Sequence, residues 1–278
     1  MYKLTIVAGD THFTSDMFHL RQLAAQAEKF QKEYGIAPLD KGDIVIITGD
    51  ASVLYYPKQT QTESQLIGEY NKIFPWTTVF PEGNHDNFPR LNALPRRQWS
   101  GGEVGVIANK LMHLRRSQIF EINGKTFFIL GGANSMDKGF RTPGVTWWPE
   151  ELVNKREKDQ AVAVLEDVSW KVDYVITHAG PYTPIRNAFS DFVQTTNPKS
   201  CYYDPVEFFL DKIYDKLSFK HWYCGHYHRD KCLGNLTVIY QNLIDIDTGK
   251  SLLVYNDDWI EGYLYGIAYK KELIGDDL

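Results

Sequence analysis

The chain has 278 residues, of which 43% are hydrophobic and 23% are charged. These shares are typical of an ordinary soluble globular protein and exclude a disordered or fibrous chain. The formal net charge of -5 argues against broad binding to duplex nucleic acid, which requires a basic face. It does not exclude a small phosphorylated substrate, because a metal ion or a few cations in one cleft can outweigh the global charge.

The first half of the chain alternates strand-like and helix-like segments. Short apolar runs predict strands, and apolar residues at helical spacing predict helices. In chain order we expect a strand at residues 4–8, a helix at 17–34, a strand at 43–48, a helix at 60–73 and a strand at 76–80. This alternation favours parallel strands joined by crossover helices, and therefore an α/β core.

The second half begins with a hairpin signal. Asn123-Gly124 lies between two β-rich runs within residues 117–132, which predicts a tight turn. Further along we expect a helix at 150–167, a strand at 173–177, a helix at 205–217, a strand at 221–224 and short strands joined by turns over 233–269. No repeat, low-complexity tract or long linker divides the sequence, so we predict one domain over residues 1–278.

Cysteine usage and the N-terminus indicate a compartment. Cys201, Cys224 and Cys232 leave one thiol unpaired under any intramolecular pairing, which favours reduced thiols. The N-terminal apolar run is short and is followed at once by Asp10, so neither a signal peptide nor a membrane span is visible. We expect a cytoplasmic protein with no membrane partner.

Polar side chains of metal-ligand type follow five of the expected strands. In chain order they are Asp10 and His12, then Asp50, then Asn84, His85 and Asp86, then His178, then His226 and His228. Ligands bind at the carboxyl edge of open α/β sheets. Each residue alone fits a common turn or a core histidine, so the prediction depends on the whole series occurring in this strand context.

The chemistry of the series points to metal ions. The predicted ligands are Asp10, His12, Asp50, Asn84, His178, His226 and His228. Oxygen and imidazole donors without thiolate suit borderline divalent metals such as Mn, Fe, Co or Zn. The donors suffice for two ions that Asp50 could bridge, and two metals about 3.5–4 Å apart form a clamp for displacement at phosphorus.

The order D-x-H, G-D, G-N-H-D, a lone H and G-H-x-H resembles the calcineurin-like metallophosphoesterase superfamily. The resemblance runs from Asp10 to His228. It implies an α/β fold of four layers, in which two mixed β-sheets pack as a sandwich flanked by helices. It also implies a hydrolase of phosphoric esters with its active site at the edge of the sheets.

The resemblance further implies roles for single residues. Asp10, His12, Asp50 and His228 would hold one metal, and Asp50, Asn84, His178 and His226 the other. His85 would be the general acid, Asp86 would orient and charge it, and a metal-activated hydroxide would be the nucleophile. Mn is the first expectation for the two ions, with Fe, Zn, Ni, Co and Mg as alternatives.

Differences from related motifs reduce the range of expected substrates. Phosphoprotein phosphatases of the superfamily typically read G-D-x-x-D-R-G and G-N-H-E, whereas no arginine follows Asp50 in residues 51–60 and the third motif ends in Asp86. The pattern is more similar to the phosphodiesterase-type branch, so we expect a small-molecule or nucleotide phosphomonoester or phosphodiester. A phosphoprotein phosphatase, a nuclease acting on small or single-stranded nucleic acid and a non-catalytic scaffold remain alternatives.

Arg141 is the expected substrate-binding residue. It lies in a glycine-containing loop after the second strand of the hairpin. A guanidinium there offers two parallel hydrogen bonds to phosphate or carboxylate. The alternative is a surface arginine in a structural loop.

Overall fold

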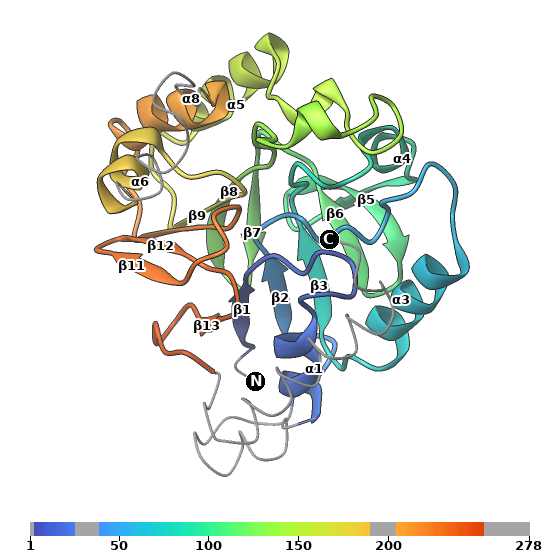
Figure 1. Ribbon diagram of the computed structural model, residues 1–278. Helices are drawn as coiled ribbons and strands as arrows, with labels where there is room; N and C mark the ends of the chain where they lie inside the picture. Colours follow the sequence, from blue (N-terminus) through green and yellow to red (C-terminus); the bar gives the residue numbers. More distant parts are fainter. Residues whose placement is uncertain (1–2, 26–38, 190–203, 253–278) are drawn as a thin grey trace.

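The computed structural model describes residues 3–25, 39–189 and 204–252, and it is built around two β-sheets (Figure 1). The first sheet has the order β13-β1-β2-β3-β6-β5-β4. Its strands are β1 (Thr5–Ala8), β2 (Ile44–Ile47), β3 (Thr77–Phe80), β4 (Arg96–Trp99), β5 (Gly102–Ala108), β6 (Leu111–Leu114) and β13 (Leu243–Asp245). The pairs β1–β2, β2–β3 and β3–β6 are parallel, whereas β13, β5 and β4 pair antiparallel with their neighbours, so the sheet is mixed.

The second sheet has the order β11-β12-β10-β9-β8-β7 and is also mixed. Its strands are β7 (Gln118–Ile122), β8 (Lys125–Leu130), β9 (Tyr174–Thr177), β10 (His221–Cys224), β11 (Lys231–Leu233) and β12 (Leu236–Val238). The expected hairpin joins β7 and β8, with φ of 49° at Asn123 and 74° at Gly124. Positive φ at both central residues gives the turn the twist that a two-residue hairpin needs.

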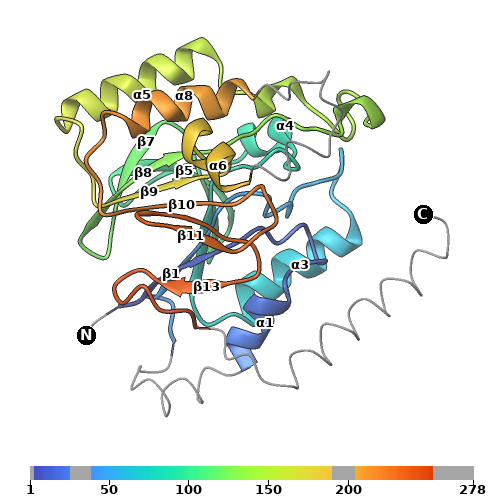
Figure 2. The same cartoon turned by 60° about the vertical axis from the view of Figure 1, so that its left-hand side comes forward.

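Helices cover the outer faces of both sheets (Figures 1 and 2). On the first sheet lie α1 (Phe18–Ala25) and α3 (Gln61–Lys72), and on the second lie α5 (Lys155–Asp167), α6 (Tyr182–Ala188) and α8 (Pro205–Tyr214). The loops carry the short elements α4 (Phe88–Asn92), η1 (Lys138–Phe140) and η2 (Pro149–Glu151). The expected sandwich of two mixed sheets flanked by helices is confirmed.

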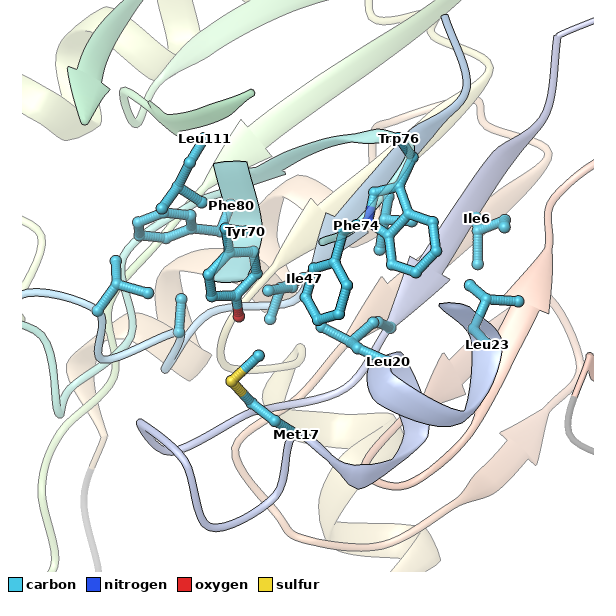
Figure 3. Packing of buried hydrophobic residues seen from close by; sticks show 14 of the residues in the cluster. Ile6, Met17, Leu20, Leu23, Ile47, Tyr70, Phe74, Trp76, Phe80 and Leu111 are labelled. Atoms are coloured by element: carbon cyan, nitrogen blue, oxygen red, sulfur yellow. The ribbon is translucent and has the colours of Figure 1, made fainter. Parts of the chain in front are cut away.

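Three clusters of buried apolar side chains lie between these layers. Between the first sheet and its helices, Met17, Leu20 and Leu23 point from the α1 region toward Tyr70 and Phe74 (Figure 3). A second cluster lies between the other sheet and its helices, and a third fills the space between the two sheets. Strands that are covered on both faces show continuous apolar sequence rather than alternation, as the TIVA and IVII runs do.

Most expected elements agree with the structure, and their ends differ for local reasons. The helix expected at 150–167 begins only at Lys155, because residues 149–151 form a separate 3₁₀ turn and Asn154 caps α5 in a capping box with Glu157. Of the helix expected at 17–34, residues 26–34 lie outside the described residues. The tail forms β11, β12 and β13, with Gly234 at the expected turn, and residues 253–269 lie outside the described part.

Two further expectations concern thiols and membranes. Cys224 is buried and Cys232 is exposed, and both are free, whereas Cys201 lies outside the described residues. Within the ranges that the structure describes, none of the helices combines the length and the apolar character needed to cross a bilayer. The single domain and the cytoplasmic location stay predictions.

Candidate metal centre

The loops after β1, β2 and β3 of one sheet meet the loops after β9 and β10 of the other. The backbone there is strained at four of the predicted ligands, with φ of 37° at His12, 48° at Asp50, 69° at His226 and 50° at His228. Such conformations are costly outside glycine and persist where the surrounding structure enforces them, commonly at functional sites. All seven predicted ligands lie in these loops.

Asp50 occupies the centre of the group and is almost fully buried. Its Oδ2 lies 3.4 Å from His12 Nε2 and 3.3 Å from His178 Nε2. Its Oδ1 accepts a hydrogen bond of 2.7 Å from the backbone N–H of His85. Burial by itself would raise the pKa of Asp50, but the charges of His178 and His85 outweigh it and hold that pKa well below the usual range. The carboxylate is therefore ionised and adjoins both halves of the centre.

The first half of the centre contains Asp10, His12 and His228. The Nε2 atoms of His12 and His228 lie 3.2 Å apart, and His228 Nε2 lies 3.7 Å from Asp10 Oδ2. His12 Nδ1 donates to Asp16 Oδ2 at 2.7 Å, which leaves Nε2 directed at the centre. Burial opposes protonation of His12, but the carboxylates of Asp16 and Asp50 raise its pKa to about 11. A carboxylate behind a histidine is the usual partner of a metal-ligating imidazole.

The second half contains Asn84, His178 and His226. Asn84 Oδ1 lies 3.0 Å from both His178 Nε2 and His226 Nδ1. His178 Nδ1 donates to the carbonyl of Thr48 at 3.0 Å, so its Nε2 is the ring nitrogen that faces the centre. The amide of Asn84 donates in the other direction, through Nδ2 to Ser135 Oγ at 3.1 Å. Its oxygen is thereby turned toward the two histidines.

Three residues that support the ligands are absent from the sequence prediction: Asp16, Ser135 and Glu151. Ser135 Oγ donates to Glu151 Oε2 at 2.5 Å, and Glu151 is fully buried. The sequence offers one signal for Asp16, which is an acidic residue four positions after the histidine of D-x-H. Ser135 and Glu151 gave no signal, because they reach Asn84 from a different loop and only the fold brings them together.

The donors fit divalent cations. Asp10 Oδ1 is buried and has no hydrogen-bond partner among the described residues, and burial raises the pKa of this carboxyl to about 6 against the opposing charges of His178 and His12. Three overlapping sets of ligand atoms lie within 4.8 Å of one another: Asp10, His12 and His228; Asp10, Asp50 and His178; and His12, Asp50 and His85. A buried acceptor without a donor is costly and is satisfied by a bound cation. Which ion each residue holds stays a prediction.

Two motif glycines let the backbone approach the carboxylates. A Cβ on Gly83 would lie 2.0 Å from Asp50 Oδ1, and one on Gly225 would lie 2.0 Å from Asp10 Oδ1. No other residue fits at either position without displacing a carboxylate. The close approach of these carboxylates therefore explains why glycine begins both G-N-H-D and G-H-Y-H.

His85 and Arg141 meet on the open side of the centre. His85 Nε2 lies 4.0 Å from Asp50 Oδ2. Arg141 Nη2 lies 2.7 Å from Nδ1 and 2.8 Å from Nε2 of His85, and its Nε donates to Asp137 Oδ2 at 2.7 Å. Burial lowers the pKa of His85 to about 4, with Asp50 opposing the shift and Arg141 adding to it. The loop of Arg141 thus reaches the cleft as expected.

Asp86 requires a correction. We expected its carboxylate to orient His85, but its Oδ1 accepts from the backbone N–H of Ser52 and its Oδ2 from that of Gly83, both at 2.8 Å. The side chain is fully buried, and no hydrogen bond to His85 is present among the described residues. Asp86 points beneath its own loop because two buried N–H groups there need an acceptor. It acts as a positioning residue for the loop.

Comparison with known proteins decides the family. The family model for calcineurin-like phosphoesterases matches residues 4–230. The chain belongs to the calcineurin-like phosphoesterase family. The family is one of phosphoesterases, and the described residues of this chain include groups that could hold a metal ion.

Other comparisons are more distant. A solved structure similar to this calcineurin-like phosphoesterase is that of a Staphylococcus aureus protein, provisionally described as a 5′-nucleotidase, in complex with alpha-ketoglutarate. The identity is 12% and the TM-score 0.42, and the match covers 95% of this chain and 58% of the other. None of the curated proteins matches the sequence. The family assignment depends on the family model alone.

Proposed function

We propose that the protein hydrolyses phosphomonoesters or phosphodiesters at a centre of two divalent ions, with manganese as the first candidate. The observation that carries this proposal is the position of Asp50, whose Oδ2 adjoins His12 on one side and His178 on the other. When bound, two such ions would neutralise the phosphate and activate a water molecule for attack on phosphorus. The substrate is a small molecule or a nucleotide.

The proposal assigns four ligands to each ion, and Asp50 is shared by both. Asp10, His12, Asp50 and His228 hold the first ion, and Asp50, Asn84, His178 and His226 hold the second. The hydrogen bonds of His12 with Asp16 and of His178 with the carbonyl of Thr48 support this division, because each fixes which ring nitrogen faces the centre. Asp50 belongs to both sets, so its loss affects both ions.

His85 and Arg141 act on the substrate. His85 protonates the leaving oxygen, and Arg141 binds a non-bridging phosphate oxygen. Without substrate, Arg141 Nη2 lies against both ring nitrogens of His85 and disfavours the protonated imidazole. The two roles are therefore compatible only if the phosphate draws Arg141 away from His85. The contact of Arg141 with Asp137 provides a second anchor during that movement.

Metal content and turnover of matched variants test the proposal. Wild-type protein is expected to bind about two equivalents of a transition metal and to hydrolyse a generic aryl phosphate mono- or diester. Asp50→Asn is expected to bind fewer ions and to lose most of its activity. His85→Ala is expected to keep both ions while kcat falls by about 10²–10⁴. His221→Ala is the control, because His221 lies on β10 and contacts Thr237, away from the centre.

Two results would contradict this proposal. One is full activity of the wild-type protein after complete removal of metal. The other is loss of both ions in His85→Ala, which would make His85 a ligand rather than an acid.

A further inference from the structure

A cavity of about 500 Å³ adjoins the metal centre. Its lining includes residues of the centre, among them Asp50, His85 and His226. The lining also includes the hydrophobic or aromatic side chains of Met136, Ile185, Phe189 and Tyr227, which come from the loop after β8, from α6 and its C-terminal end, and from the last motif. A cavity lined by both polar and apolar side chains can receive an ester whose phosphate and organic group differ in polarity.

The volume of the cavity is larger than a phosphate group needs. Cavities of about 300–1,000 Å³ typically enclose organic ligands of some size, whereas a phosphate ion fills only a small part of such a volume. Met136 is half-exposed, and its unbranched side chain adapts to flat surfaces and contacts aromatic rings through sulfur. Tyr227 stacks against Phe189 with ring centroids 5.8 Å apart, so the two rings together form one wall of the cavity.

The charged residues of the cavity differ in whether they are paired. Asp137 contacts Arg141 at 2.7 Å, and Arg186 contacts the buried Glu207 at 2.9 Å. Arg229 lies over the ring of Phe189, 5.8 Å from its centroid, and has no carboxylate partner within residues 3–25, 39–189 and 204–252. Arg229 directly follows His228 of the centre, so its positive charge faces the same cavity.

We infer that this cavity is a subsite for the organic group of the ester, and that it favours an organic group with both a planar ring and a second anionic group. The inference rests on the proposed function and adds a substrate class to it. The ring lies on the side chain of Met136 and the wall formed by Phe189 and Tyr227. The second anion pairs with Arg229, whose guanidinium suits phosphate or carboxylate.

The ring is tested with two substrates whose phosphate leaves from the same kind of primary hydroxyl. Adenosine 5′-monophosphate and ribose 5-phosphate carry the phosphate on the same primary carbon and differ in the planar base. Both are used as monoesters and as their methyl diesters, so that either type of hydrolysis is detected. We expect kcat/KM to be at least about tenfold higher for the adenosine ester. Adenosine 3′,5′-bisphosphate, which adds a second anion to the ribose of the same nucleoside, should gain a further factor of about ten.

Matched variants show which residues cause the preference for the base and the preference for the second anion. Met136→Ser should reduce the preference for the base about three- to tenfold, and Phe140→Ser is its control, because Phe140 lies near it in sequence, is 97% exposed and is not part of the cavity wall. Arg229→Gln should remove the gain from the second anion. Lys231→Gln is its control, because Lys231 lies over the same Phe189 ring at 5.2 Å but outside this cavity.

Binding of adenosine to metal-free protein gives a readout independent of turnover. Saturation-transfer NMR should show contacts to the base in wild type and in both controls, and weaker contacts in Met136→Ser. Equal kcat/KM for the adenosine and ribose esters, or variants that match their controls, would overturn the inference while leaving the proposed function intact. No hydrolysis of any ester with Mn, Mg, Zn or Ni would instead overturn the proposed function.

Discussion

Residues outside the motifs orient the side chains of individual ligands in this centre. Asn84 illustrates the point, because an amide has a donor end and an acceptor end and only the acceptor can bind a cation. Ser135 accepts from Nδ2 of Asn84 and donates to Glu151, so the whole chain of hydrogen bonds turns Oδ1 toward His178 and His226. The orientation of one ligand therefore depends on a loop about 50 residues further along the chain.

Ser135→Ala is expected to weaken metal binding without abolishing it. Without the serine hydroxyl the amide of Asn84 loses its fixed partner, and changes to such supporting residues typically cost about 10–100-fold in metal affinity. A calorimetric Mn²⁺ titration measures the loss, and kcat at saturating metal should stay close to that of wild type. Ser64→Ala in α3 is the control, because the hydroxyl of Ser64 hydrogen-bonds to Gln59 and Thr60 beside the start of that helix and not to a residue of the centre. An unchanged titration in Ser135→Ala would show that Asn84 does not need this support.

At the scale of elements, the sequence predicted the features that local patterns determine. Apolar runs identified β1, β2, β3, β9 and β10, and the polar residues directly after them include the seven predicted ligands, which the structure brings together at one place. The strands β4, β5 and β6 were not predicted. β4 reads RRQW with three exposed polar residues and shows no apolar run, whereas β5 (GEVGVIA) and β6 (LMHL) carry apolar residues that the prediction did not use. The role of Asp86 was misjudged for a similar reason, since its partners Ser52 and Gly83 become close only when two loops fold together.

Helix α1 carries a histidine that makes stability depend on pH. His19 is 3% exposed, its Nε2 has no hydrogen-bond partner in the part of the chain that the structure describes, and burial lowers its pKa to about 4 from an unfolded value near 6.5. Above pH 6.5 the residue is neutral in both states. As the pH falls from 6.5 to 4 the unfolded state takes up the proton first, so folding loses about 3 kcal/mol.

His19→Leu should remove this dependence. Urea unfolding of metal-free wild type and variant at pH 7.5, 6 and 4.5 measures it, and the wild type should lose more stability than the variant on acidification. Buried acids such as Glu207, whose pKa burial raises to about 7, titrate alike in both proteins and cancel in the difference. A constant difference between the two proteins at all three pH values would show that His19 is not the group responsible.

At the scale of the whole molecule, the two sheets share one apolar interior. The cluster between them takes Val7 and Ile46 from the first sheet and Phe127, Tyr174 and Tyr223 from the second, all buried. The metal centre takes its residues from the loops of both sheets in the same way. Neither sheet can bury its inner face alone, so we expect the described layers to unfold together.

Hydrogen exchange during urea unfolding tests this cooperativity. Amides of β2 and β9, one strand from each sheet, are expected to lose protection at the same urea concentration. Leu20→Ala, in the helix layer of the first sheet only, should cost about 2–5 kcal/mol and lower both midpoints equally, because the interior between the sheets couples them. Leu165→Ala in α5, on the opposite outer layer, is the matched substitution and should shift both midpoints as well. If either variant lowered the midpoint of its own sheet alone, the two sheets would be separate cooperative units, and the prediction of one domain would be wrong.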